Sequence, residues 1–167
     1  MKEKNIAIEL LKKLLAERVT IYQKTNLVQA EKFSDLLNRA LSNYLKGLLT
    51  NEEVIQELLK LAAEISESEN QGNELGLTAE EKSFYDALTK PRAVQDIYTN
   101  EQLVAMTKEL TDALRKNRTI DWQKKESARA GMRRMIKRLL KKYKYPPEEA
   151  ENALETVIHQ CEQWSDN

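Results

Sequence analysis

The chain has 167 residues with 27 Lys and Arg against 27 Asp and Glu, so its formal net charge is zero. It contains only 4 Gly and 3 Pro and lacks strand-like Val/Ile/Thr alternation, which indicates an all-α fold rather than a sheet protein. One cysteine excludes an intrachain disulfide, and no apolar run is long enough to span a bilayer. We therefore expect a cytoplasmic protein with no membrane contact.

Two amphipathic helices are predicted at the start of the chain, over 5–25 and 27–49. Apolar residues recur in both at helical spacing, and the second helix is expected to turn Leu45 and Leu48 inward. Gly47 weakens the last turn of this second helix.

Three capping boxes predict the starts of three further helices. In each, a threonine is followed three residues later by Glu or Gln, at Thr50, Thr78 and Thr99. The polar segment 66–74 reads either as the frayed end of the first of these helices or as a mobile loop. A short helical turn is expected within 91–98, and the third capped helix ends near 117.

The last two predicted helices cover 121–143 and 147–164 and form an antiparallel hairpin. Tyr145-Pro146-Pro147 separates them, because the residue before a proline is pushed out of the α region and proline suits a first helical turn. Trp122 and Trp164 are expected to staple this hairpin from both ends. The fold class is thus an all-α, irregular bundle of about six to eight helices ending in a basic/acidic hairpin, with 1–167 as a single helical domain.

Charge is strongly uneven within the hairpin. Residues 124–144 hold ten Lys and Arg against one Glu, whereas 145–167 hold six acids and no Lys or Arg. The basic helix is the one sharp candidate for function. Its candidate DNA- or partner-binding residues, four apart along two parallel ridges, are Arg129, Arg133, Arg134, Lys137, Arg138 and Lys141.

Two interpretations of this basic surface remain open. It can neutralise phosphates along a nucleic-acid backbone, without sequence preference. It can instead be a solvated face, or a contact to an acidic protein, partly neutralised by the glutamates of the following helix. The closeness of the acidic segment favours the protein contact.

No motif for catalysis or metal binding appears, so no catalytic or metal-ligating residue is predicted. A phosphate-binding glycine loop is absent. His159 and Cys161 are the sole residues of their types, and two residues apart on a helix they do not share a face. A thiol–imidazole enzyme is the weakest hypothesis, and a core cysteine beside an exposed histidine is the alternative.

Two segments carry a resemblance to a known family. Residues 74–88 read E-L-G-L-T-A-E-E-K-S-F-Y-D-A-L, and residues 134–147 read R-M-I-K-R-L-L-K-K-Y-K-Y-P-P. Both resemble motifs in the C-terminal helical domain of the restriction (R) subunit of type I restriction–modification enzymes. Ser83 stands where the family often has alanine, and Lys144 where it often has glycine.

The resemblance implies that the chain is the C-terminal fragment of a larger R subunit. The parent would be an ATP-dependent type I site-specific deoxyribonuclease, with ATP and Mg²⁺ used by its N-terminal motor and nuclease domains. The fragment itself would need no cofactor and would not be an enzyme. It would dock the motor subunit onto the methyltransferase core of modification and specificity subunits, with direct DNA-backbone binding by the basic helix as the alternative.

Overall fold

The computed structural model describes the backbone of residues 2–166 and the side chains of residues 5–164. All its regular elements in this range are helices, which confirms the all-α prediction. The chain divides into two compact units, which we call the N-terminal unit (1–76) and the C-terminal unit (77–167). The single domain expected from the sequence stays a prediction.

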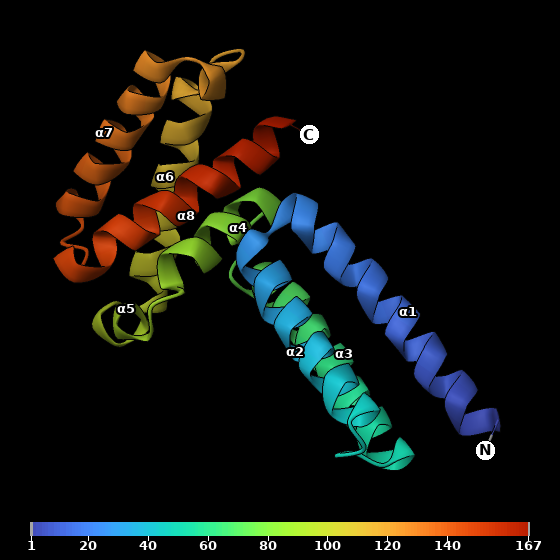
Figure 1. Cartoon of the computed structure of the whole chain (residues 1–167). Helices are drawn as coiled ribbons and strands as arrows, with labels where there is room; N and C mark the ends of the chain where they lie inside the picture. The colour runs from blue at the N-terminus through green and yellow to red at the C-terminus, as the bar shows by residue number, and fades with distance from the viewer. Residues whose placement is uncertain (1, 167) are drawn as a thin grey trace. The chain divides into compact units, whose positions relative to one another are not determined.

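The N-terminal unit consists of three long helices packed side by side (Figure 1). They are α1 (Lys2–Thr25), α2 (Leu27–Leu45) and α3 (Asn51–Glu74). Each turns one apolar stripe into a shared core, whose fully buried members include Phe33, Val54 and Leu58. The helices are held mainly by this stripe-to-stripe burial, because helices of this length gain most of their stability from packing.

The end of α2 differs from the sequence prediction. The helix stops at Leu45, and Leu45 and Leu48 are exposed rather than inward. Gly47 has φ +78°, and the Leu48 amide donates to the Asn43 carbonyl, so a left-handed glycine closes the helix in a Schellman motif. Leu45 in the last helical turn and Leu48 beyond it therefore lie at the surface, whereas Leu49 packs against the core.

Segment 66–74 is neither frayed nor a loop, because α3 continues through it to Glu74. Glu69 anchors this part of α3 to α1: it forms an ion pair with Arg18 and accepts a hydrogen bond from the Tyr22 hydroxyl at 3.3 Å. These contacts join residues 51 and 47 positions apart, so local sequence does not reveal them.

The C-terminal unit is built around one short central helix. α4 (Ala79–Thr89) is buried from Lys82 to Thr89 and packs against the long helices α6 and α8. The remaining elements are α5 (Arg92–Ile97), α6 (Asn100–Asn117), the 3₁₀ helix η1 (Trp122–Lys124), α7 (Glu126–Lys142) and α8 (Pro147–Asp166). The short helix expected within 91–98 is thus confirmed as α5.

The three predicted capping boxes are present at the starts of α3, α4 and α6. In each, the threonine hydroxyl accepts the backbone N–H three residues on, and the Glu or Gln side chain accepts the threonine N–H. Such caps satisfy donors that the first helical turn leaves unpaired.

The predicted hairpin is present, with α7 and α8 in contact on either side of the proline corner (Figure 1). Tyr145 anchors the corner, because its buried side chain donates a hydrogen bond to the Leu88 carbonyl of α4 at 2.7 Å. This burial raises the pKa of the Tyr145 hydroxyl. Tyr98 adds a second tie by donating to the Tyr143 carbonyl at 2.7 Å.

Two predicted details of the hairpin are wrong. α7 begins at Glu126 and not at 121, because Asp121 is left-handed (φ 57°) and Lys125 is extended, so η1 is a separate turn. Trp164 does not staple α7 to α8: its indole N–H donates to the Ser83 hydroxyl of α4 at 2.9 Å. Trp122 is buried in η1, which packs on α7.

Candidate docking surface on the basic helix

The basic helix α7 buries one apolar stripe and carries cations on its other sides. Met132, Ile136 and Leu140 are almost fully buried in the C-terminal unit. Because a helix turns by 100° per residue, the cations between these positions point in several directions. The structure divides them among three sides of α7, each with different neighbours.

On the side that faces α8, two of the six predicted site residues are neutralised inside the hairpin. Arg129 donates to the Glu162 carboxylate at 2.6 Å and to the Gln123 carbonyl at 3.3 Å. Arg133 donates from both terminal nitrogens to the two carboxylate oxygens of Glu155. The predicted neutralisation of part of the ridge by the acidic helix is therefore confirmed.

The Arg133–Glu155 pair changes the titration of both groups. The hydrogen bond from Arg133 lowers the pKa of the Glu155 carboxyl, and the bond to Glu155 raises the pKa of the Arg133 guanidinium. The bidentate geometry is the strong form of an arginine–carboxylate contact. Because Arg133 already binds Glu155 within the hairpin, it is a poor candidate for binding another molecule.

On the side that faces α6, Lys142 is also paired. Its ammonium donates to Glu109 of α6 at 2.6 Å, and the Tyr143 hydroxyl donates to the same carboxylate. Both hydrogen bonds lower the pKa of the Glu109 carboxyl, and the bond from Lys142 has the larger effect. Sequence reasoning missed Glu109, because 33 residues separate it from Lys142 and no local signal connects them.

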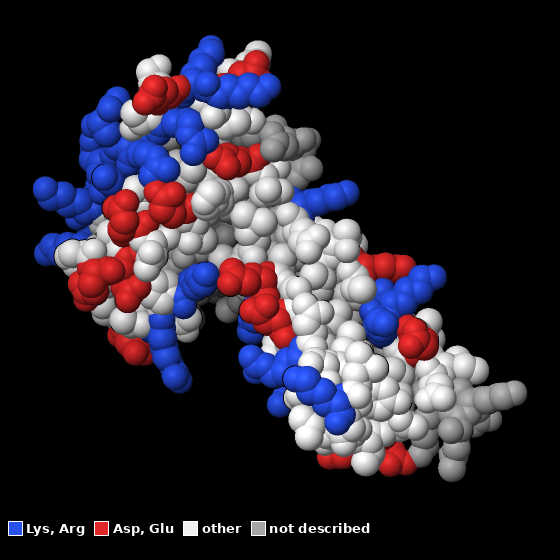
Figure 2. Space-filling view, viewed as in Figure 1, with Lys and Arg blue, Asp and Glu red and all other residues white. Residues whose placement is uncertain are grey.

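The third side holds the other four predicted site residues, which we call the outward basic face: Arg134, Lys137, Arg138 and Lys141. All four are exposed, and among the described residues none of them forms an ion pair or a hydrogen bond. Their spacing of three, four and seven residues places them on one stripe of α7. Figure 2 shows Lys and Arg side chains gathered over α7 beside the acidic side chains of α8.

The four cations of the outward basic face have no paired carboxylate among the described residues. Like charges three and four residues apart on a helix repel and destabilise it slightly. Nothing within the described part of the chain offsets this repulsion on the outward basic face, whereas the other two sides of α7 have their own carboxylates. An anionic partner would supply the missing counter-charge, and the two arginines can hold carboxylates or phosphates in a bidentate way.

His159 and Cys161 do not form a reactive pair. The His159 side chain is 61% exposed, with Nδ1 at 3.7 Å from Glu162, whereas Cys161 is fully buried. Burial raises the pKa of the Cys161 thiol to about 11, so the nucleophilic thiolate is disfavoured. The alternative of a core cysteine beside an exposed histidine is confirmed.

No group of three or more His, Cys, Asp or Glu residues that could hold a metal ion occurs among the residues described here. Within the same residues, no helix combines the length and hydrophobicity needed to cross a membrane.

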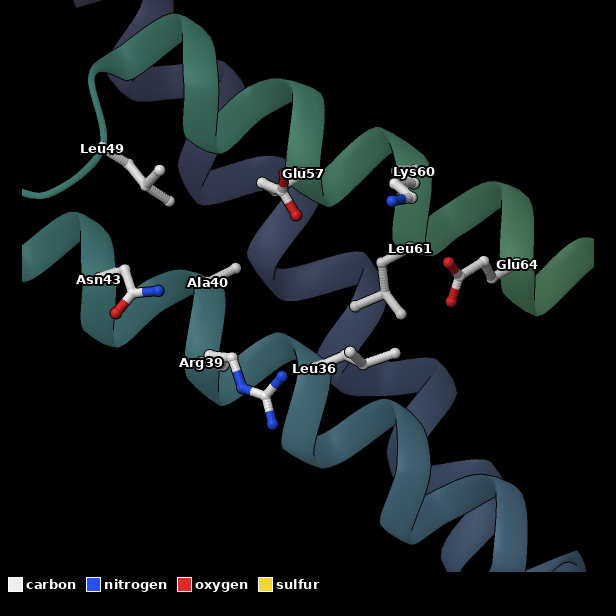
Figure 3. A pocket seen from close by; sticks show the side chains of 9 residues that line it. All are labelled: Leu36, Arg39, Ala40, Asn43, Leu49, Glu57, Lys60, Leu61 and Glu64. Carbon is white, nitrogen blue, oxygen red and sulfur yellow. The ribbon is translucent and has the colours of Figure 1, made fainter. Parts of the chain in front are cut away.

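A shallow groove between α2 and α3 is a weaker candidate site in the N-terminal unit (Figure 3). Leu36, Ala40 and Leu61 contribute apolar surface to it. Its charged side chains are two cations and two carboxylates: Arg39, Lys60, Glu57 and Glu64. Since these charges balance, the groove favours no charged ligand, and the outward basic face remains the principal candidate.

Comparison with known proteins places the chain in a family. A family model described as "Type I restriction enzyme HindI endonuclease subunit-like, C-terminal" matches residues 1–167. The "Type I restriction enzyme HindI endonuclease subunit" of Haemophilus influenzae is 39% identical over 160 residues, which are 96% of this chain and 15% of the relative. The "Putative type I restriction enzyme MjaIXP endonuclease subunit" of Methanocaldococcus jannaschii is 30% identical over 140 residues, covering 83% of this chain and 13% of the relative.

No solved structure matches the chain. The chain spans less than a sixth of the length of either relative, and the family match extends over all of its residues. The chain therefore belongs to the family of C-terminal domains of HindI-like type I restriction enzyme endonuclease subunits.

Proposed function

We propose that the chain is a non-catalytic assembly domain, which docks a type I restriction endonuclease subunit onto a methyltransferase core of modification and specificity subunits. The outward basic face of α7 makes the contact with an acidic surface of that core. The observation that carries the proposal is the stripe of four exposed cations that have no partner among the described residues. Membership of a family of type I restriction enzyme endonuclease subunits supports a role within a larger complex.

The size and surroundings of the face favour a protein partner over DNA. From Arg134 to Lys141 the stripe is about 10 Å long, at 1.5 Å per helical residue. Glu151 of α8 lies near α7, has no ion-pair partner among the described residues, and would repel a polyanion that continued past the stripe. A protein surface can instead place a few carboxylates against the cations and leave the acidic flank uncovered.

The experiment is a binding titration of the chain with the purified methyltransferase core. Reversing two charges in Lys137→Glu/Lys141→Glu should weaken binding on the order of 100-fold, because each acidic partner then meets a like charge. Lys108→Glu/Lys116→Glu on α6 is the matched control, since both lysines are exposed and the charge change is equal. Equal binding by the two double variants would contradict the proposal.

DNA-backbone binding is the second candidate, and the linear order of the exposed cations favours it. Such binding would be made through phosphates, without sequence preference, and would weaken steeply with salt. The same Lys137→Glu/Lys141→Glu variant should then lower the salt slope by about two for every sequence. Gel shifts at two salt concentrations distinguish this candidate: a chain that binds no DNA at low salt rules it out.

We also expect ATP hydrolysis and DNA cleavage to take place outside this chain. ATP and Mg²⁺ belong to the N-terminal motor and nuclease domains of the parent subunit, and this chain contributes no residue to hydrolysis or cleavage. The purified chain should accordingly show neither ATPase nor nuclease activity. ATP hydrolysis that a point mutation within this chain abolishes would overturn that view.

A further inference from the structure

The outer face of α1 carries an apolar stripe that the N-terminal unit does not use. α1 packs on α2 and α3 through Ile8, Leu15 and Val19. On its opposite side Ile6, Leu10, Leu14 and Ile21 are 65%, 54%, 49% and 50% exposed. The exposed large apolar residues of other elements occur singly or at a helix end, as is normal on protein surfaces. A row along one helix instead marks an interaction surface.

The sequence of the stripe matches the pattern by which two helices pair. Leu10, Leu14, Glu17 and Ile21 follow one another at intervals of four, three and four residues, which is the alternation of core positions in a coiled coil. Glu17 is the one charged residue in this row. Among the described residues, neither Glu17 nor the neighbouring Lys13 has an ion-pair partner.

We propose that this face binds a second copy of the chain, with the two α1 helices antiparallel about a twofold axis between Leu14 and Glu17. Leu10 of one copy then packs on Ile21 of the other, and Leu14 lies opposite Glu17. Lys13, next to Leu14, reaches the Glu17 carboxylate of the second copy, and the symmetry makes this ion pair twice.

Charge selects the antiparallel arrangement over the parallel one. In a parallel pair Glu17 would face its own equivalent, and two carboxylates in a core position repel. In the antiparallel pair each Glu17 meets Lys13, which is unpaired in the single chain. A charged residue in an otherwise apolar seam also fixes the register, because sliding by one turn would move Glu17 away from Lys13 of the second copy.

Sedimentation equilibrium of the full chain over a range of concentrations tests the proposal. The mass should rise from one chain to two as concentration increases. Leu14→Glu should weaken the dimer by at least about 100-fold, since it puts a carboxylate against Glu17 of the other copy. Leu59→Glu, at a residue 48% exposed on α3, is the matched control and should leave the dimer unchanged.

A charge swap tests the pairing itself. Lys13→Glu and Glu17→Lys should each weaken the dimer by roughly tenfold, and the double variant should restore it, because the ion pair is rebuilt with reversed polarity. Circular dichroism confirms that each variant is folded. A mass of one chain at every concentration overturns the proposal, as does association that Leu14→Glu leaves intact. Failure of the double variant to restore the dimer overturns the antiparallel register.

Discussion

The Cys161 side chain lies in a part of α8 where it is fully buried, and its chemistry follows from that position. Desolvation raises the pKa of the thiol from 9.0 to about 11. The protonated thiol therefore stabilises the fold below pH 9, and this contribution is lost as the pH rises towards 11. Cys161 is a core residue whose thiolate form is disfavoured by burial.

We accordingly expect Cys161 to resist alkylation in the folded chain. At pH 8 iodoacetamide should leave the native thiol almost unmodified and should modify it fully in urea, because only unfolding exposes the sulfur and restores its ordinary pKa. Mass spectrometry measures the modified fraction. Rapid modification of the native chain would show that the thiol is accessible and would reopen a catalytic role.

Lys144 stands in a backbone conformation that favours glycine. Its φ is 58°, and the Tyr145 amide donates to the Leu140 carbonyl at 2.9 Å, so Lys144 is the left-handed residue of a Schellman motif that ends α7. Gly47 has the same role at the end of α2. Glycine would therefore be the unstrained residue at this corner, and the lysine here is held by the buried Tyr145 that follows it.

Replacing Lys144 by glycine should stabilise the chain by roughly 0.5–1 kcal/mol. Relief of the left-handed strain outweighs the greater flexibility of glycine in the unfolded state. The reverse change, Gly47→Lys, should destabilise by about 1 kcal/mol or more. Urea denaturation measures both free energies of unfolding, and a loss of stability in Lys144→Gly would contradict the assignment of strain.

The elements of this fold differ in how far sequence predicts them. Threonine capping boxes are local, so they located the starts of α3, α4 and α6 correctly. The proline corner likewise separated α7 from α8. In contrast, the end of α3 contacts α1 through Glu69 and Arg18, and Lys142 of α7 pairs with Glu109 of α6. These contacts join residues far apart in sequence, and periodicity carries no information about them.

The candidate site shows the same limit. Helical spacing identified every cation of α7, and charge alone predicted that α8 would neutralise some of them. The rotation of α7 about its axis decides which cations are neutralised. That rotation is set by the burial of Met132 and Ile136. The structure therefore replaces two predicted ridges with one outward face.

Within α7, Gly131 weakens the helix without a visible structural need. A Cβ added at Gly131 would meet only the Arg134 guanidinium, at 4.0 Å. Gly131→Ala should therefore stabilise the chain by about 0.5–1 kcal/mol, the ordinary difference between the two residues in a helix. Thermal or urea unfolding checks this value. A destabilising effect would mean that the added methyl group meets atoms closer than the 4.0 Å contact with Arg134.

The pairing of α7 with α8 should depend on pH through Glu155. Arg133 lowers the pKa of this carboxyl below its ordinary 4.5, so the pair stabilises the fold above that pH and is lost as the pH falls through the folded-state pKa. Because both side chains are about a third or more exposed, Glu155→Gln should cost only about 0.5–1 kcal/mol at pH 7. The difference from the unmodified chain should vanish in acid, and a difference that persists at pH 3 would contradict this account.

The formal net charge of the whole chain is zero, yet its two units expose surfaces of different character. In the C-terminal unit, carboxylates of α6 and α8 neutralise two sides of α7 and leave the third side basic. In the N-terminal unit, α1 leaves an apolar stripe instead. The two surfaces suit different partners, an acidic one for the basic face and an apolar one for the stripe of α1.

We expect the outward basic face of α7 to be covered when the chain joins the methyltransferase core. Covalent labelling of lysines, with and without the core, measures this directly by mass spectrometry. Lys137 and Lys141 should lose most of their reactivity in the complex, whereas the exposed Lys60 of α3 should keep its own. If a complex forms and the labelling of Lys137 and Lys141 is unchanged, the docking surface lies elsewhere and this expectation is wrong.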